Sequence, residues 1–438
     1  MDRSYWHNAL QNVLYGQPDN QRTNPLHRLA RQSLRYSPYG NTPYRQSSGH
    51  TFGRQFQIMD MIYRNELNYY FNNEVQLHID ERKAAVAIML PIVRKILNKI
   101  HTMDPRFKSD PIFIGSFWSG LKVGEPDEFD INVPLNITPK NYHWDIMSET
   151  SRLGSSPLSS NPVETSKPGY NIVMDLPTNP IWLCHPFPKL IVNNHLIPLL
   201  VKNAFKMYLE DAVHVLNFAS VQVTVSPNQA GPAITIIITY RDLQRRVRQL
   251  SVDLAPIFRS MTSFPSWIKW PRPGRAWPSD EKVAKIKEIG INNVPKGDLK
   301  WYMSFAECEK ELTKDMDKYG SNTNRKKLHR IMKRLTHDLW CPGPKPVVSS
   351  YMLKNLLFWE CEDFPDPSDW ENDVIWKRFC SLTNRLVEAL SKRQLKLYFY
   401  PEINLLEGKD GSKLDAVIHH IQSFMRNPTF YLQGIDGW

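Results

Sequence analysis

Three acidic residues have the types and spacing that could support metal-dependent chemistry. Glu128 and Asp130 lie two residues apart in a segment that alternates polar and apolar residues, as a half-buried strand does. Side chains at this spacing point to one face of a strand, so the pair can share a cation. Asp253 lies on another apolar segment, where an unpaired carboxylate is costly. Together they predict a site for phosphoryl or nucleotidyl transfer, in which bound metal ions neutralise phosphate charge.

A Gly-Ser pair upstream of these acids could approach a phosphate closely. Gly115 and Ser116 end a short apolar segment, Pro111-Ile-Phe-Ile, which we expect to be a strand. Glycine permits a close backbone approach, and the serine hydroxyl is a hydrogen-bond donor. Ser116 precedes Glu128 by twelve residues, which leaves room for a turn, a short helix and a returning strand. Gly-Ser pairs and acid-apolar-acid patterns are common, so the prediction depends on their combination with Asp253.

The surrounding elements follow from hydrophobic periodicity. Residues 79–100 have apolar residues at three- and four-residue steps, which predicts a helix. Residues 234–240 and 249–255 predict neighbouring strands, and residues 148–169 predict a long loop. The turn between those two strands is strongly basic, with Arg241, Arg245, Arg246 and Arg248.

The chain divides into three predicted parts. Residues 1–54 are basic and poor in aliphatic residues, so we expect a disordered basic arm. Residues 55–270 form the predicted core lobe, which ends at the proline-rich segment 270–278. Residues 271–438 form a helical lobe, in which periodicity places helices at 305–318, 326–339, 349–361 and 374–393.

Composition limits the compartment and the partners. The 438 residues carry a formal net charge of +11, which favours polyanionic partners such as nucleic acid or an anionic membrane. Five scattered cysteines without a CxxC pair indicate a reducing compartment. No apolar run is long enough to span a bilayer, and the first ten residues lack the core of a signal peptide. We therefore expect a cytoplasmic protein with access to the nucleus.

These motifs resemble cyclic GMP-AMP synthase and its animal relatives, the Mab-type nucleotidyltransferases. The resemblance covers residues 75–410 in collinear order. It is carried by Gly115-Ser116, Glu128-Phe-Asp130, Gly231-Pro-Ala-Ile-Thr, Val252-Asp253, Trp301-Tyr-Met-Ser-Phe, Glu309-Lys-Glu-Leu, Ser349-Ser-Tyr-Met-Leu-Lys and Tyr400-Pro-Glu-Ile-Asn-Leu.

The resemblance implies an α+β bilobal fold, with a mixed sheet, a long spine helix and a C-terminal helical lobe. It implies Mg²⁺ or Mn²⁺ bound by three catalytic acids, here Glu128, Asp130 and Asp253, and ATP and GTP as substrates. The positions that match nucleotide contacts of the family are Gly115, Ser116, Glu309, Lys333, Ser350 and Tyr351. Lys333 and Tyr351 also have simpler interpretations, as a surface lysine and a core tyrosine.

Two departures from the vertebrate enzyme affect the expected trigger and product. Residues 311–328, where that enzyme inserts a zinc module, contain neither Cys nor His, so we expect no structural zinc. Tyr302 stands where the vertebrate enzyme has a base-reading arginine, so base choice and product identity can differ from those of that enzyme. Relatives without the zinc module include sensors of double-stranded RNA, so we expect double-stranded RNA rather than DNA as the trigger.

Two basic segments are candidates for nucleic-acid contact. The first lies on the predicted spine helix and just beyond it, and the second on the helical lobe. Such segments could follow a duplex backbone without sequence preference, or simply be solvated. The contacts that we predict are Arg94, Lys95, Lys99, Lys326, Lys327 and Arg330. Dimerisation on nucleic acid is implied by the resemblance alone.

Three alternative functions remain open at this point. A catalytically silent Mab-type protein would bind nucleic acid or nucleotide without chemistry, although silent members often lack part of the acid set. An oligoadenylate synthetase-like enzyme would make a linear polymer instead of a cyclic dinucleotide. A membrane-surface protein would bind anionic lipid through the basic arm.

Overall fold

The structure is a computed structural model of the whole chain. It describes residues 49–136, 142–145, 169–174, 181–182, 187–193, 195–227, 231–259, 264–265, 267–296, 300–317 and 323–433. Side chains are described in these ranges except at 49–57, 142–145 and 169–174. Most of the predicted basic arm and of the predicted loop 148–169 therefore lies outside the described residues.

The chain divides into two compact units, which are described separately. The sheet unit contains residues 77–274 and 278–315, and the helical unit contains residues 15–76, 275–277 and 316–438. This division differs from the predicted boundaries at 54 and 270. The sheet unit extends to residue 315 because its last strands lie beyond residue 290, where periodicity alone indicated a helical lobe.

Eleven strands in the described residues form one mixed sheet. Its main path runs β1-β2-β9-β10-β11-β4-β6-β5, with β3 paired to β4, and β8 placed between β7 and β9. β2 and β9 are parallel, and the other pairs are antiparallel. The strands are β1 (Ile112–Ile114), β2 (Glu128–Pro134), β3 (Tyr142–Asp145), β4 (Gly169–Met174), β5 (Ile191–Val192), β6 (His195–Leu196), β7 (Gln222–Val225), β8 (Ile234–Arg241), β9 (Val247–Arg259), β10 (Asn292–Val294) and β11 (Trp301–Ser304).

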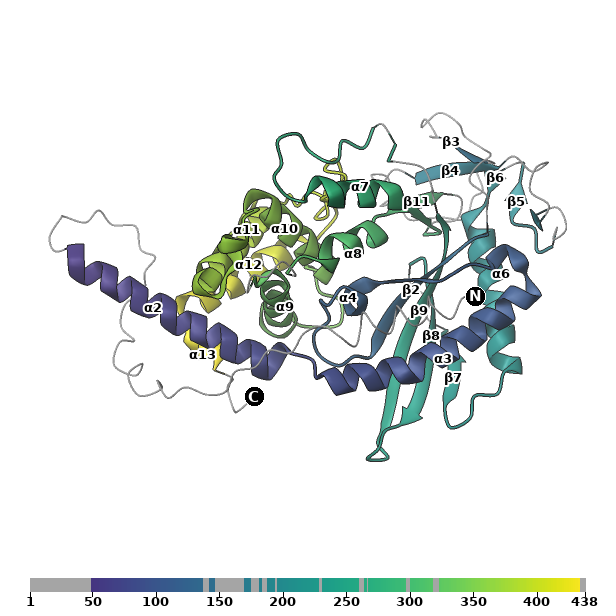
Figure 1. Cartoon of the computed structure of the whole chain (residues 1–438), viewed down its shortest axis with the longest axis horizontal. Helices are drawn as coiled ribbons and strands as arrows, with labels where there is room; N and C mark the ends of the chain where they lie inside the picture. The colour runs from purple at the N-terminus through teal and green to yellow at the C-terminus, as the bar shows by residue number, and fades with distance from the viewer. Residues whose placement is uncertain are drawn as a thin grey trace. The chain divides into compact units, whose positions relative to one another are not determined.

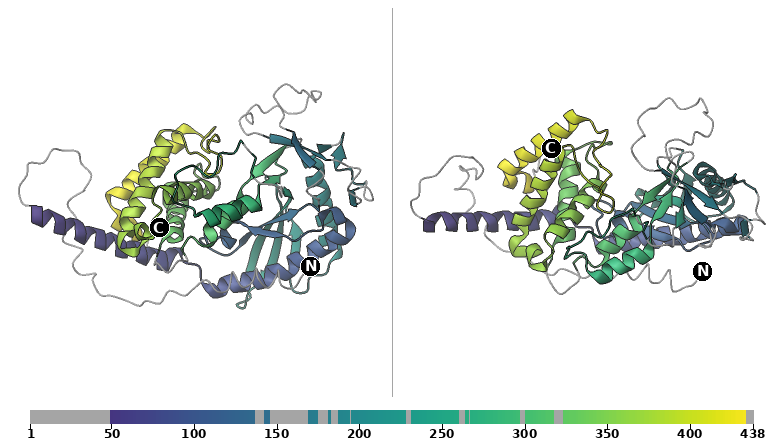
Figure 2. Two further views of the ribbon diagram at one scale, coloured as in Figure 1. Left: turned by 45° about the horizontal axis from the view of Figure 1, so that its top comes forward. Right: turned by 90° about the horizontal axis from the view of Figure 1, so that it is seen from above.

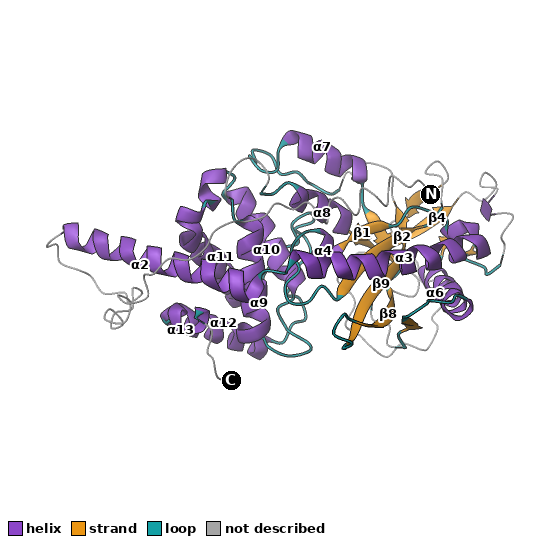
Figure 3. Cartoon of the chain, turned by 60° about the horizontal axis from the view of Figure 1, so that its bottom comes forward, coloured by secondary structure: helices purple, strands orange, loops and turns teal. Residues whose placement is uncertain are grey.

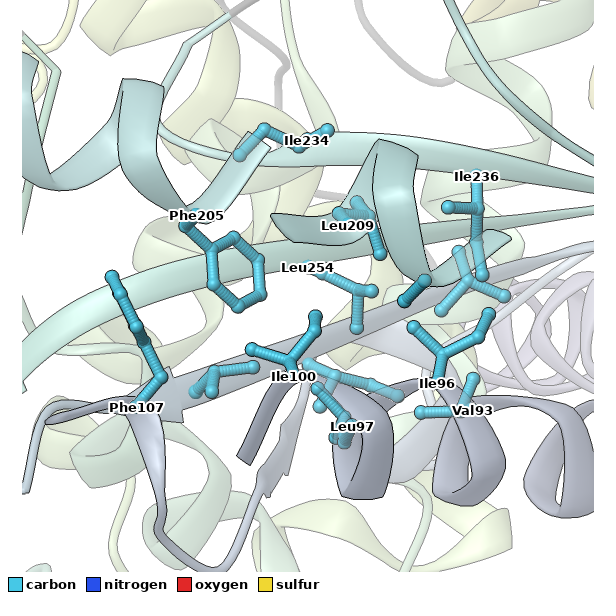
Figure 4. Close-up of a cluster of buried hydrophobic side chains, with 14 of the residues drawn as sticks. Val93, Ile96, Leu97, Ile100, Phe107, Phe205, Leu209, Ile234, Ile236 and Leu254 are labelled. Carbon is cyan, nitrogen blue, oxygen red and sulfur yellow. The ribbon is translucent and has the colours of Figure 1, made fainter. Parts of the chain in front are cut away.

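Two helices cover one face of this sheet. α3 (Ile79–Met103) is the predicted spine helix, and it runs across the strands with α6 (Pro198–Val215) beside it (Figures 1 and 3). Their apolar sides meet the strands in the main core (Figure 4), which includes Val93, Ile96, Leu97, Ile100, Phe205, Leu209, Ile234, Ile236 and Leu254. The mixed α+β architecture predicted from the sequence, with its spine helix and helical C-terminal region, is confirmed.

The other face of the sheet has a smaller apolar cluster and a polar area. Ile112, Ala255 and Ile257 form the buried part of the cluster. Phe129 and Ile131 of β2 and Val252 and Leu254 of β9 are buried in the main core. Because side chains alternate between faces along a strand, the residues next to them point away from this core. Glu128, Asp130 and Asp253 occupy such positions.

Two further helices of the sheet unit are joined to its first strand. α7 (Asp280–Ile289) packs on α8 (Ala306–Lys314), and Lys282 Nζ of α7 forms ion pairs with Glu311 and Asp315 at 2.6 and 3.0 Å. Lys310 Nζ of α8 donates a hydrogen bond to the Phe113 carbonyl on β1 at 2.7 Å. α8 is therefore held at the strand that leads into the Gly-Ser pair.

The helical unit contains the predicted C-terminal helices (Figure 2). The predicted 326–339, 349–361 and 374–393 correspond to α9 (Arg325–Leu335) with a following turn, α10 (Ser350–Asp363) and α11 (Ile375–Ser391). α12 (Gly411–Arg426), α13 (Pro428–Leu432) and α2 (Gly49–Tyr70) also belong to this unit. α2 begins inside the segment predicted to be disordered, so that prediction is wrong for residues 49–54. Among the described helices, none combines the length and apolar character that crossing a bilayer requires.

A buried histidine makes the helical unit sensitive to acid. Burial lowers the pKa of His329 on α9 to about 3, and the nearby Lys333 and Lys354 charges act in the same direction. Below the pKa that the histidine has in the unfolded chain, this site binds a proton only in the unfolded state. The free energy of unfolding therefore decreases as the pH is lowered. We expect the free energy of unfolding to lose about 2 kcal/mol more between pH 7 and pH 5 than in His329→Gln. Urea denaturation of both proteins at the two pH values tests this, and equal losses would contradict it.

Candidate active site on the polar face of the sheet

Asp130 and Asp253 lie side by side on the two parallel strands. They are register partners of β2 and β9, so their side chains share one face of the sheet. Thr235, the register partner of Asp253 on β8, donates its hydroxyl hydrogen bond to Asp253 Oδ1 at 2.6 Å. Both carboxylates are half-buried. The structure therefore brings together two predicted metal ligands that are 123 residues apart (253 − 130).

Glu128 lies close enough to influence this pair electrostatically. Burial raises the pKa of Asp253, the Thr235 hydrogen bond lowers it, and the Glu128 charge raises it, so that the net pKa is above the ordinary value. The Glu128 side chain is 54% exposed, at the first residue of β2. A cation at this face would relieve the repulsion among the three carboxylates.

Gly115 packs directly against the Asp130 carboxylate. β1 pairs with β2 so that Ile114 is the register partner of Asp130, which places the next residue beside the acid. Gly115 has φ +83°, and a Cβ at this position would overlap Asp130 Oδ2 and lie 2.6 Å from Cγ. Glycine is thus required twice here, for its backbone conformation and for space. Ser116 follows it in the short helix α4 (Gly115–Trp118) and is half-buried.

Lys122 is a site residue that the sequence analysis missed. Its Nζ forms ion pairs with Asp127 Oδ1 and Glu128 Oε2, both at 3.0 Å, and its side chain is 10% exposed. Burial lowers the pKa of Lys122, but the Glu128 and Asp127 carboxylates more than offset this, and the net pKa is raised. Lys122 therefore neutralises part of the acidic cluster and holds one oxygen of Glu128.

Thr235 was also missed, although its signal was present. Ile234 and Ile236 point into the core, so the intervening threonine must lie on the face of the acids. Lys122 had no comparable signal, because its contacts depend on how the segment between α4 and β2 turns back.

The donor set fits a hard divalent cation in its chemistry. Carboxylate oxygens are the ligands that Mg²⁺ and Mn²⁺ prefer, and Asp130, Asp253 and Glu128 are the residues that would hold such an ion. Among the described residues, no three acidic, His or Cys side chains converge closely enough to enclose a metal ion as they stand. Lys122 already engages Glu128 and holds this carboxylate at the start of β2.

Replacing Lys122 tests whether it orients Glu128 toward a cation. Hydrogen-bonded partners of metal ligands typically change affinity about 10–100-fold when removed. We expect Lys122→Met to weaken Mn²⁺ binding in that range, measured by electron paramagnetic resonance of free Mn²⁺, and Lys122→Arg to retain most of the affinity. Tighter binding by Lys122→Met would instead identify Lys122 as a competitor of the metal.

The other predicted nucleotide contacts are distributed over both units. Glu309 on α8 is only 2% exposed, so it is a buried group of the sheet unit in this conformation. Lys333 on α9 is half-buried, Ser350 at the start of α10 is exposed, and Tyr351 is 38% exposed. The ammonium of Lys354 lies 5.2 Å from the centroid of the Tyr351 ring. Tyr351 is therefore not the core residue of the simpler interpretation, and its ring is accessible for stacking.

Three of the predicted nucleic-acid contacts already have internal partners. Lys95 donates to the Asn217 carbonyl at 2.6 Å, Lys327 to Asn68 Oδ1 at 2.6 Å, and Arg330 to the Val75 carbonyl at 3.0 Å. Arg94, Lys99 and Lys326 are half-buried.

Two further arginines of the two basic segments are buried and therefore cannot contact a nucleic acid. Arg106 is 2% exposed and pairs with Asp104 at 2.7 Å. Arg325 is 4% exposed and donates to the Met316 carbonyl at 3.1 Å. The density of basic residues in the sequence therefore overstates the surface available to a duplex.

Comparison with known proteins agrees with this arrangement. Residues 117–315 match the Mab-21 protein nucleotidyltransferase domain, and residues 324–423 match the Mab-21 protein HhH/H2TH-like domain. The chain is similar to protein mab-21-like 3 of Danio rerio, with 27% identity over 397 residues that cover 84% of this chain and 98% of the relative. It is also similar to protein mab-21-like 3 of Xenopus laevis, with 26% identity over 360 residues, which cover 80% and 93%.

Proposed function

Because the chain belongs to the Mab-21 nucleotidyltransferase-domain family, we propose that it joins ATP and GTP into a cyclic dinucleotide second messenger. The observation that carries this proposal is the pairing of Asp130 with Asp253 beside Gly115, with the Glu128 charge acting on Asp253. A nucleotidyltransferase domain needs acidic groups of this kind to bind its metal ions. Bound Mg²⁺ or Mn²⁺ would supply charge neutralisation of the triphosphate.

The residues of the chain would act as follows. A ribose hydroxyl of one nucleotide attacks the α-phosphorus of the other, and the P–O bond to pyrophosphate breaks. Asp253 accepts the hydroxyl proton, since its carboxylate lies on the same face of the sheet as Asp130. A second transfer between the remaining triphosphate and hydroxyl closes the ring and releases a second pyrophosphate. Lys333 would contact phosphate, and Tyr351 would stack on a base.

We infer that double-stranded RNA triggers this reaction, as part of antiviral innate immunity in the cytoplasm. The support is the net charge of +11. Internal partners of Lys95, Lys327 and Arg330 reduce this support.

Product analysis tests the proposal. Radiolabelled ATP, GTP, CTP and UTP are incubated with Mg²⁺ and no trigger, duplex RNA or duplex DNA, and separated by thin-layer chromatography. We expect a phosphatase-resistant product that requires ATP, GTP and RNA and is lost in Glu128→Ala/Asp130→Ala. A phosphatase-sensitive ladder would indicate a linear polymerase, and a DNA-dependent product would overturn the RNA trigger.

A catalytically silent binding protein is the second candidate. The engagement of Glu128 by Lys122 and the burial of Glu309 favour it, because both residues would have to be available to substrate in an active enzyme. This candidate predicts nucleotide or duplex binding without product under every condition. Calorimetric titration of ATP and GTP, combined with the product assay, separates the two.

A further inference from the structure

The β8–β9 hairpin extends beyond the strands on either side of it. β7 pairs with β8 only as far as Thr239, and β2 pairs with β9 only from Ser251 onward. Residues 240–248 consequently pair only with each other among the described strands, with Arg241 opposite Val247. The hairpin end projects from the lower edge of the sheet in Figure 1.

The turn at this end is held in one conformation by its own hydrogen bonds. The Arg245 amide donates to the Asp242 carbonyl at 2.8 Å, and the Asp242 amide donates to the Arg246 carbonyl at 3.0 Å. The Asp242 carboxylate accepts from the Arg246 amide at 2.9 Å and from its guanidinium at 2.8 Å. Leu243, Gln244 and Arg245 therefore form a well-ordered tip.

Arg245 occupies a backbone conformation that favours glycine. Its φ is +61°, in the left-handed region that L-residues with a side chain adopt at a cost. Hairpin turns of this kind usually have glycine at that position. An arginine kept at an unfavourable conformation suggests that its side chain has a role outside the turn.

The tip combines an exposed apolar side chain with clustered positive charge. Leu243 is 99% exposed and Val247 is 59% exposed. Residues 241–248 contain four arginines and one aspartate. Arg248 forms ion pairs with Asp242 and Glu125, and Arg246 forms one with Asp242 at 2.8 Å. Arg241, Arg245 and Arg246 are all exposed around Leu243.

We propose that this hairpin end docks on an anionic membrane surface, with Leu243 inserted between lipid headgroups and the three arginines against their charges. A rigid apolar tip surrounded by cations gains from both the acyl boundary and anionic lipid. A nucleic acid would use the arginines but not Leu243, and the aromatic residue of the hairpin end, Tyr240, is half-buried three residues before Leu243. The proposal concerns attachment and does not depend on the proposed catalysis.

Vesicle co-sedimentation of the full chain tests the proposal. The vesicles consist of phosphatidylcholine alone or mixed with phosphatidylserine. We expect binding only to the mixed vesicles, reduced about tenfold in Leu243→Ser through loss of one buried leucine side chain. Arg245→Gly is expected to reduce binding about fivefold, the contribution of one basic residue at such a surface. Glycine suits the turn, so the thermal stability of this variant should be equal or higher.

Matched variants elsewhere on the chain define the specificity. Phe187→Ser removes an apolar side chain that is 80% exposed, and Lys409→Ala removes an exposed cation, both outside the hairpin. Both should bind mixed vesicles like the unmodified chain. Unchanged vesicle binding by the two hairpin variants would overturn the proposal. So would loss of duplex-RNA binding without loss of vesicle binding, which would assign the hairpin to nucleic acid.

Discussion

Asp253→Asn is expected to lower the rate of product formation about 10³-fold, since the proposed proton acceptor is removed from the acid pair. The fold should tolerate the change, because asparagine has the same shape and its side-chain oxygen can still accept the Thr235 hydrogen bond. Product formation under the triggering condition measures the first effect, and thermal unfolding measures the second. Full turnover by the variant would remove Asp253 from the mechanism.

The same variant has a signature in the pH dependence of stability. A carboxyl group whose pKa is raised on folding binds a proton more readily in the folded than in the unfolded state. Its contribution to stability is therefore lost as pH rises from the ordinary aspartate range through the folded pKa. The free energy of unfolding of Asp253→Asn, relative to that of the unmodified chain, should therefore be higher at neutral pH than in acid. Asp211→Asn, a change at an exposed residue of α6, is the control and should alter neither rate nor pH dependence.

Gly115→Ala is expected to be the most destabilising single-methyl change near the site. The added Cβ would overlap Asp130 Oδ2 at φ +83°. Left-handed strain and overpacking together should lower the free energy of unfolding by about 3–4 kcal/mol. Displacement of Asp130 should also abolish metal-dependent activity. Chemical denaturation and the product assay measure the two effects.

Gly124→Ala is the matched control for this prediction. Gly124 has a similar φ of +74°, but a Cβ there would have no neighbour within 4 Å. Only backbone strain remains, so we expect a loss of about 1–2 kcal/mol with retained activity. Equal destabilisation by both substitutions would show that the Asp130 contact contributes nothing.

The acidic part of the candidate site depends on local patterns, which the sequence displays. Alternation along residues 128–133 placed Glu128 and Asp130 on one face, and the apolar neighbours of Asp253 identified a second strand. The register that makes Asp130 and Asp253 partners is a long-range property of the sheet. Sequence alternation permits any even shift of one strand along the other, so it cannot choose this register.

The basic surfaces were harder to predict, because charge patterns do not indicate which cations have partners. Lys327 and Arg330 lie at helical spacing on α9, as a solvated stripe would, yet both donate to α2 or the turn that follows it. A helix beginning at Gly49 was not predicted, because residues 1–54 have few aliphatic residues. Farther along α2, Tyr63 and Arg64 contact Trp376 and Asp373, and local propensity does not include such tertiary packing.

The resemblance to a known family implied the fold class, whereas the sequence by itself determined the helix over residues 79–100, the acid-bearing strands and the glycine upstream of them. These depend on periodicity and residue chemistry over short segments. Only the tertiary structure decided that Lys122 engages Glu128, that Thr235 hydrogen-bonds Asp253, that Glu309 is buried and that the sheet unit extends to residue 315. Such contacts are set by strand register and chain reversal, which bring distant residues together and leave no periodic trace in the sequence.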